Sequence, residues 1–200
     1  MKADNEPALS LILGGARSGK SAYAEALAAQ LGPRVLYVAT AEALDEEMEA
    51  RIAAHRAARP PAWTTLEAPL NVGAALRAHP TAAGADAILL DCLTLLVSNV
   101  LLVGDSDAPE LDVESAWERV RAEVDGLVEA QRELGVDLII VSNEVGWGVV
   151  PPYSLGRTYR DCLGWANQAL ARAADRVVLL VAGLPLDLKA LPLARIEAGT

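Results

Sequence analysis

Gly14, Gly19, Lys20 and Ser21 lie at the spacing that a phosphate-binding loop requires. The eight residues GGARSGKS (14–21) match the pattern G-x-x-x-x-G-K-[ST] in full. Glycines let consecutive backbone N–H groups curl around phosphate oxygens, the lysine reaches the β- and γ-phosphates, and the serine hydroxyl can bind Mg²⁺. An apolar run precedes the loop and a helix-like run follows it. The stretch therefore predicts a nucleotide-binding loop in preference to a glycine-rich structural turn.

A carboxylate that could complete a metal site ends another apolar run. Residues 87–92 read AILLDC, with Asp91 directly after four apolar residues. In P-loop proteins, such an aspartate holds Mg²⁺ together with the hydroxyl of the loop. We therefore expect Ser21 and Asp91 to ligate the ion. In the alternative interpretation, Asp91 only caps the end of a strand.

A histidine between two arginines is the second candidate for chemistry. The sequence predicts a helix over 46–58, and helical spacing places His55 in one row with Arg51 and Arg59. Two flanking cations and no carboxylate partner are an unusual setting for a structural histidine. A neutral imidazole could attack an α-phosphate, with the arginines stabilising the charge that develops. A solvent-facing helix surface explains the row equally well, and His79 is expected in a surface turn.

The elements that must position these residues alternate along the chain. Short, nearly continuous apolar runs predict strands that are covered on both faces, and amphipathic segments between them predict helices. The expected fold is α/β, a P-loop NTPase-type (RecA-like) three-layer sandwich with a mostly parallel central sheet. The stretch WTTLEAP (63–69) could add a further strand, although Pro69 and its weak alternation of apolar and polar residues count against it. The predicted strands are 9–13, 35–40, 87–92, 137–144 and 176–182, and the predicted helices are about 20–31, 46–58, 70–78, 113–134 and 157–173.

Composition limits the kind of protein. With 200 residues and 52% hydrophobic content, we expect a single domain over 1–200. A net charge of −10 argues against nucleic-acid partners and anionic lipid. Cys92 and Cys162 fit no metal-binding spacing and are interpreted as reduced thiols of a cytoplasmic protein, a disulfide being the alternative. The sequence contains no run that is long and apolar enough to span a membrane, and the stretch 103–112 is expected to be a surface loop.

Three classes of P-loop protein can be compared on the sequence. A switch GTPase reads guanine with an Asn-Lys-x-Asp segment, which is absent; the nearest stretch, SNEV (142–145), lacks both the Lys and the Asp. A motor or recombinase-like ATPase usually needs more chain for coupling. A small-molecule kinase fits in one domain and is favoured.

Five blocks of sequence together resemble the bifunctional adenosylcobinamide kinase/adenosylcobinamide-phosphate guanylyltransferase family of cobalamin assembly. The resemblance runs from about residue 11 to 189. The blocks are GGARSGKS, LYVATAEALDEEMEARIAAHRAARPPAWTTLEAP, LLDCLTLLVSN, VSNEVGWGVVP and GRTYRDCLGWANQALARAADRVVLLVAGLP. The resemblance implies phosphorylation of the aminopropanol hydroxyl of adenosylcobinamide, followed by transfer of GMP from GTP through a guanylylated histidine.

The resemblance also assigns roles to particular residues. It implies that His55 is the nucleophile, although many members have a second histidine where this chain has Ala54. It further implies a homotrimer, and it leaves open whether ATP or GTP donates the first phosphate. The implied nucleotide-binding residues are Gly14, Gly15, Ala16, Arg17, Ser18, Gly19, Lys20, Ser21, Val38, Ala39, Thr40, Arg56, Ala57, Ala58, Arg59, Glu67 and Asp91.

Two assignments stay open at this point. Residues 142–151 (SNEVGWGVVP) could approach the corrinoid or a neighbouring subunit, and Arg157, Arg160 and Asp161 could do so through their charges; packing is the alternative. The second function hypothesis is a regulatory or structural P-loop ATPase without covalent GMP chemistry, in which the row of His55 is only a surface.

Overall fold

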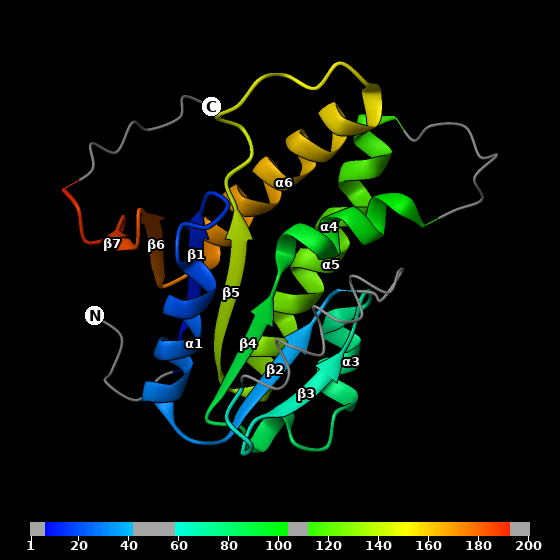
Figure 1. Cartoon of the computed structure of the whole chain (residues 1–200). Coiled ribbons are helices and arrows are strands. Elements are labelled where there is room, and N and C mark those ends of the chain that lie inside the picture. Colours follow the sequence, from blue (N-terminus) through cyan, green and yellow to red (C-terminus); the bar gives the residue numbers. More distant parts are fainter. Residues whose placement is uncertain (1–6, 42–58, 104–111, 193–200) are drawn as a thin grey trace.

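The structure is a computed structural model that describes residues 7–41, 59–103 and 112–192 (Figure 1). Within these ranges the chain is α/β, with helices on both faces of one mostly parallel, seven-stranded sheet. This confirms the predicted fold class. The predicted helix over 46–58 and most of the predicted loop at 103–112 lie outside the described residues, and the single domain over 1–200 stays a prediction.

The sheet has the strand order β3-β2-β4-β5-β1-β6-β7, with β1 paired in parallel to β5 on one side and β6 on the other. All five predicted strands are present, and the doubtful stretch at 63–69 forms the edge strand β3. The strands are β1 (Leu9–Gly14), β2 (Val35–Ala39), β3 (Thr64–Glu67), β4 (Ala87–Asp91), β5 (Asp137–Asn143), β6 (Arg176–Val181) and β7 (Leu184–Asp187).

Strand β7 was not predicted from the sequence. It is short, lies at the sheet edge and pairs antiparallel to β6. Pro185 is tolerated there because an edge strand does not need every N–H for pairing. Ala182 and Gly183, with φ of 51° and 82°, form the tight turn between the two strands.

Four of the predicted helices are present, and a further helix, α4, was not predicted. The sequence of α4, LTLLVSNVLL, has no polar face, so its apolar run cannot be distinguished from a buried strand by periodicity. By contrast, α5 is amphipathic, starts at an Asp112 cap that accepts two backbone bonds and ends at Gly135. The helices are α1 (Lys20–Leu31), α3 (Val72–Ala78), α4 (Leu93–Leu102), α5 (Val113–Leu134) and α6 (Ser154–Ala173), with a 3-10 turn at Ala82–Gly84.

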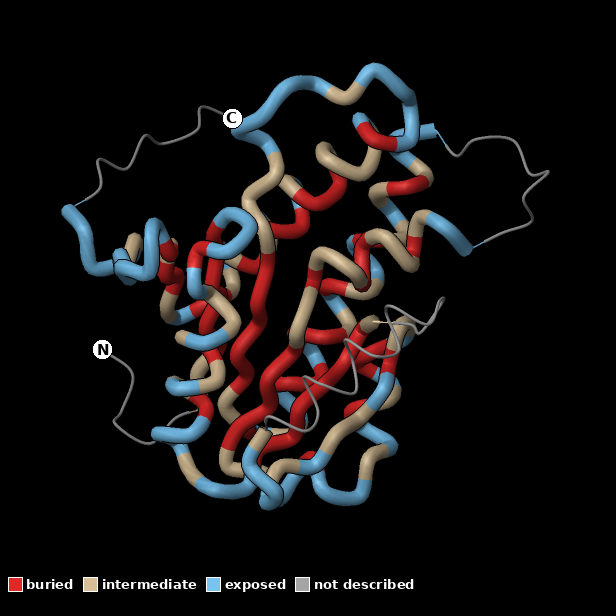
Figure 2. The backbone as a smooth tube through the Cα atoms, in the orientation of Figure 1, coloured by how far each residue is buried: buried red, intermediate tan, exposed pale blue. Residues whose placement is uncertain are grey.

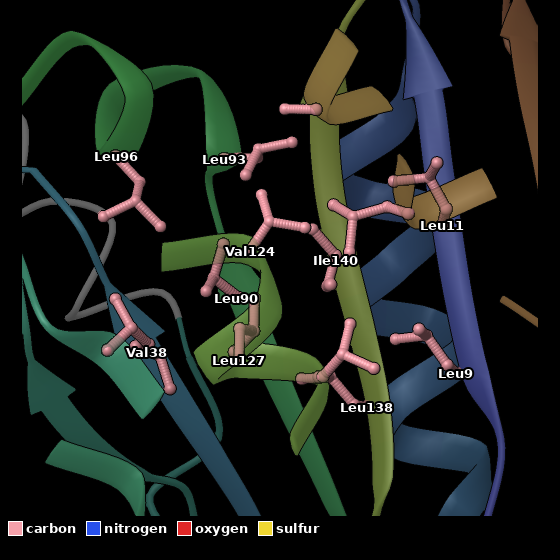
Figure 3. Packing of buried hydrophobic residues seen from close by; sticks show 14 of the residues in the cluster. Leu9, Leu11, Val38, Leu90, Leu93, Leu96, Val124, Leu127, Leu138 and Ile140 are labelled. Carbon is pink, nitrogen blue, oxygen red and sulfur yellow. The ribbon is translucent and has the colours of Figure 1, made fainter. Parts of the chain in front are cut away.

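Alternate side chains of the strands pack into two separate hydrophobic clusters, one on each face of the sheet. On β5, Leu138 and Ile140 pack in the cluster with α3, α4, α5 and α6, whereas Ile139 and Val141 pack in the cluster with α1. Figure 3 shows the first cluster, and Figure 2 shows the strands as the buried centre of the molecule. Because both faces are covered, the residues of the inner strands are mostly apolar, which is the pattern that predicted the three-layer arrangement.

Helix α3 packs closely against α5 where Gly73 meets Gly126. A Cβ atom at Gly73 would overlap the carbonyl oxygen of Gly126, whereas a Cβ atom at Gly126 would meet no atom within 4 Å. The two helices can therefore pack this closely only while position 73 is glycine.

We expect Gly73→Ala to lower the free energy of unfolding by about 1–3 kcal/mol, because the added methyl must push α3 away from α5. The matched control is Gly126→Ala, which should raise it by about 0.5–1 kcal/mol through higher helix propensity. Urea unfolding followed by circular dichroism measures both. Equal stability of Gly73→Ala and the wild type would contradict the packing described.

Candidate nucleotide-binding site

The phosphate-binding loop connects the end of β1 to the start of α1. Gly14 has no room for a side chain, because a Cβ atom there would overlap Ser18 Oγ and lie 2.9 Å from the carbonyl oxygen of Leu180. Gly19 is the N-cap residue of α1 and adopts φ of 93°, a conformation that glycine adopts without strain. Between them the Ser18 N–H donates to the Gly15 carbonyl at 3.3 Å. The glycines thus have the steric roles that the motif predicts.

The loop is open to solvent on one side and supported by the sheet on the other. Gly15, Ala16 and Arg17 are exposed, and the Lys20 ammonium donates to the Gly15 carbonyl at 3.2 Å. The Gly183 N–H, in the turn between β6 and β7, donates to the Ser18 carbonyl at 2.9 Å. The lysine and the exposed backbone of the loop therefore face solvent. The hairpin of β6 and β7, which was not predicted, supports the other side of the loop.

Asp91 lies at the carboxyl end of β4. The other predicted residues of this region lie on the same side of the sheet, where the carboxyl ends of the parallel strands meet. The register partner of Asp91 on β2 is Ala39, which pairs in turn with Glu67 on β3. Asp91 Oδ2 accepts a hydrogen bond from the hydroxyl of Tyr37 at 3.0 Å. The sheet thus brings Asp91, Ala39 and Glu67 into one row, and Tyr37 fixes the carboxylate.

Tyr37 was not predicted as part of the site. Burial, and then the charge of Asp91, raise the pKa of its phenol well above the usual range, so the phenol stays a hydrogen-bond donor. The guanidinium of Arg59 lies over its ring, 3.3 Å from the centroid, and donates to Thr65 Oγ1 at 3.4 Å. Arg59, Tyr37 and Asp91 therefore form one connected group. Tyr37 stands in an apolar strand run, where it reads as an ordinary core residue.

The predicted segment 38–40 is a buried support. The side chains of Val38, Ala39 and Thr40 are all buried. The Thr40 hydroxyl donates to the Cys92 carbonyl at 2.7 Å and accepts from the Cys92 N–H at 2.9 Å, and Asn99 Nδ2 donates to the Thr40 carbonyl at 2.8 Å. These bonds fix the ends of β2 and β4 to each other. Direct contact of this segment with a nucleotide stays a prediction.

A second carboxylate follows β5, the strand between β4 and β1. Asn143 is in register with Gly14, and the next N–H, that of Glu144, donates to the Gly14 carbonyl at 3.2 Å. Asn167 of α6 donates through Nδ2 to Glu144 Oε1 at 3.4 Å, and burial raises the pKa of the Glu144 carboxyl against the effect of this bond. No role was predicted for Glu144 from its residue type or spacing; only the block that contains it was singled out.

The donor atoms at this edge fit a magnesium ion. Ser21 and Asp91 offer a hydroxyl and a carboxylate, the hard oxygen ligands that Mg²⁺ prefers. Within residues 7–41, 59–103 and 112–192, no three His, Cys, Asp or Glu side chains gather into a metal site of their own. An ion at this edge would therefore take most of its ligands from nucleotide phosphates and water, as Mg²⁺ commonly does.

The other predictions concern residues 55–58, the two cysteines and membrane spans. His55, Arg56, Ala57 and Ala58 lie outside the described residues. Cys92 and Cys162 are free thiols, as predicted, and none of the described helices could cross a membrane.

The three charged residues singled out on α6 have local partners. Arg157 donates to the carbonyls of Pro151 and Pro152 at 3.2 and 2.9 Å, which ties the preceding loop to the helix. Arg160 forms an ion pair with Asp161 at 3.2 Å.

We expect Tyr37→Phe to lower the free energy of unfolding by about 1–2 kcal/mol, because a partly buried carboxylate loses a charge-assisted hydrogen bond. The ring under Arg59 is kept in this variant, so the loss reports on the hydroxyl. Tyr153→Phe, at a side chain that is 65% exposed, is the matched control and should have little effect. Urea unfolding measures the difference, and identical stability of the two variants would argue against the Tyr37–Asp91 bond.

Comparison with known proteins identifies the family of this chain. The family model for cobinamide kinase/cobinamide phosphate guanyltransferase matches residues 10–188. The chain is 49% identical over 183 residues to the bifunctional adenosylcobalamin biosynthesis protein CobP of Pseudomonas aeruginosa, covering 92% of this chain and 98% of the relative. It is 42% identical over 181 residues to the bifunctional adenosylcobalamin biosynthesis protein CobU of Salmonella typhimurium, covering 90% and 98%. With a match across nearly the whole chain, the loop included, this chain belongs to the cobinamide kinase/cobinamide phosphate guanyltransferase family.

Proposed function

We propose that this chain phosphorylates adenosylcobinamide with a nucleoside triphosphate and then transfers GMP from GTP to the phosphate so formed, giving adenosylcobinamide-GDP in cobalamin biosynthesis. The observation that carries the proposal is the complete loop, Gly14 to Ser21, at the carboxyl end of β1, in a chain that the family model matches over residues 10–188. The curated relatives, named as bifunctional adenosylcobalamin biosynthesis proteins, support the same pathway.

The first step is phosphoryl transfer to a hydroxyl, which depends mainly on positioning and neutralisation of charge. The loop amides and Lys20 would hold the β- and γ-phosphates. Ser21 and Asp91 would hold Mg²⁺, which when bound neutralises charge on those phosphates. Either ATP or GTP can occupy such a loop, because its contacts are to phosphates and not to the base.

The second step uses the same loop in another way. The imidazole of His55 would attack the α-phosphorus of GTP, so that a nitrogen–phosphorus bond forms and pyrophosphate leaves into the loop. The phosphate of the acceptor then displaces the histidine and takes the GMP. Among the described residues, Arg59 supports this step, because its guanidinium lies on Tyr37, whose hydroxyl is bonded to Asp91, and it can stabilise the charge that develops on the transferring group.

The assembly and surroundings of the enzyme are part of the proposal. We infer a homotrimer from the family resemblance, and a cytoplasmic location from the two free cysteines, since reduced thiols persist in reducing compartments. The partners are adenosylcobinamide, its phosphate and the nucleoside triphosphates. The net charge of −10 is unfavourable for nucleic acid.

Lys20→Ala should weaken binding of GTP and ATP by about 10- to 100-fold and abolish both transfers, because it removes the cation that contacts the terminal phosphates. Isothermal titration calorimetry measures the affinity. The control is Arg172→Ala, which removes an exposed cation in the last turn of α6 and should leave binding unchanged. Wild-type affinity in Lys20→Ala would show that the loop does not bind the triphosphate.

Incubation with Mg²⁺ and GTP labelled at the α-phosphate should leave a covalent GMP adduct without any acceptor, whereas a γ-label should not be retained. A phosphoramidate on histidine is stable in base and labile in acid, because protonation of the ring nitrogen makes it a good leaving group. His55→Ala should lose the adduct and the guanylyl transfer but keep the phosphorylation step, with His79→Ala as the control.

Three outcomes would count against this assignment of His55. These are an acid-stable adduct, undiminished labelling of His55→Ala, and a rate of nucleotide hydrolysis that does not change when adenosylcobinamide is added. The last outcome would favour a regulatory or structural ATPase.

A further inference from the structure

Glu144 is a partly buried carboxylate for which the proposed chemistry has no role so far. Among the described residues, no arginine, lysine or histidine forms an ion pair with it. Within the described part of the chain, its carboxylate accepts one side-chain hydrogen bond, the long one from Asn167, at 3.4 Å. A partly buried charge with so little compensation costs stability, and such groups are concentrated at functional sites.

The carboxylate is nevertheless held in place from two sides. Its own backbone N–H is bonded to Gly14 of the loop. Asn167, which is 6% exposed, accepts from the fully buried Ser142 hydroxyl at 2.7 Å and donates to the Asn143 carbonyl at 3.1 Å, so its amide can face Glu144 in only one orientation. These bonds fix the direction of a carboxylate that has no cationic partner among residues 7–41, 59–103 and 112–192.

The sheet order places Glu144 between the two halves of the phosphate site. Strand β5 lies between β4, which ends at Asp91, and β1, which leads into the loop (Figure 1). Ser142 and Glu144 both contact Asn167 and therefore face α6, whereas α1 lies on the opposite face of the sheet. The residues that follow, from Gly146 to Val150, are exposed, so an acceptor molecule can reach this side.

We propose that Glu144 is the general base of the phosphorylation step and accepts the proton of the acceptor hydroxyl, with Asn167 as its positioning residue. The inference rests on the proposed kinase function. Asp91 is less suited to this task, because it is bonded to Tyr37 and is the expected metal ligand. Glu67 lies on the edge strand β3, separated from β5 by β2 and β4.

In the phosphorylation step, one bond to the γ-phosphorus forms and one breaks. The hydroxyl oxygen forms a bond to the γ-phosphorus while the bond from that phosphorus to the bridging oxygen breaks, and the nucleoside diphosphate leaves with the electron pair. The hydroxyl proton passes to the carboxylate of Glu144 and later to water. Burial raises the pKa of this carboxyl, which makes its carboxylate a stronger proton acceptor than an exposed one.

The second transfer gives an internal control for this role. Its acceptor is a phosphate that is already an anion, and the attack of a neutral imidazole on GTP requires no proton from a hydroxyl. A general base for the first step is therefore dispensable in the second. A residue that only supports the loop would instead affect both steps, because both use the same loop.

The test compares the full-length wild type with Glu144→Gln, Glu144→Asp and the control Glu118→Gln, an exposed residue on α5. Glu144→Gln is nearly isosteric and keeps an oxygen for the Asn167 bond. We expect it to lower the kcat for phosphorylation of adenosylcobinamide by about 100-fold or more, the usual contribution of a general base. Its GTP affinity by calorimetry, its labelling by α-labelled GTP and its guanylyl transfer to supplied adenosylcobinamide phosphate should stay at the wild-type level. Glu144→Asp should recover part of the lost kcat.

Two results would overturn the inference while leaving the proposed function intact. One is a wild-type kcat for phosphorylation in Glu144→Gln; the other is an equal loss of both transfers, which would mark Glu144 as a support of the loop. Circular dichroism and the thermal midpoint establish that the variant is folded. If the wild type itself fails to phosphorylate adenosylcobinamide, the proposed function is wrong and the inference falls with it.

Discussion

The pairing of β1 with parallel strands on both sides is the constraint on which the rest of the structure depends. Because β5 and β6 flank it, the chain leaves β1 at Gly14 with the Leu180 backbone too close for any side chain, and it must turn at once. That turn is the phosphate-binding loop. The same pairing sets Glu144 beside Gly14, and it lets the turn between β6 and β7 support Ser18 from behind.

Around this centre, two candidate carboxylates, Asp91 and Glu144, are each held by a neighbour that is not itself expected to touch the nucleotide. Tyr37 holds Asp91, and Arg59 covers Tyr37; Asn167 holds Glu144. In both cases the supporting side chain is buried, so its position is set by the core and not by solvent. Rigid support of this kind fixes the direction of charged groups before any ligand binds, which is what transfer reactions that depend on positioning need.

The two faces of the sheet differ in what they contribute. The face toward α1 carries the loop helix and Tyr37, whereas the face toward α4 and α6 carries the Thr40–Cys92 and Asn143–Thr94 bonds and the Asn167 amide. A single residue, Cys92, separates β4 from α4. This helix supplies Thr94 and Asn99, which join the ends of β2, β4 and β5. The helix that could not be recognised from its sequence thus connects the strand ends around the site.

The sequence by itself determined the α/β class, the loop from Gly14 to Ser21 and five of the strands, because apolar periodicity and glycine spacing are local properties. It could not distinguish α4 from a strand, since a run as apolar as LTLLVSNVLL fits both. It also gave no sign of β7, whose pairing depends on a turn back onto β6. Only the tertiary structure decided that Tyr37 bonds Asp91 and that Asn167 reaches Glu144, because these contacts join residues 54 and 23 positions apart and depend on strand order and register.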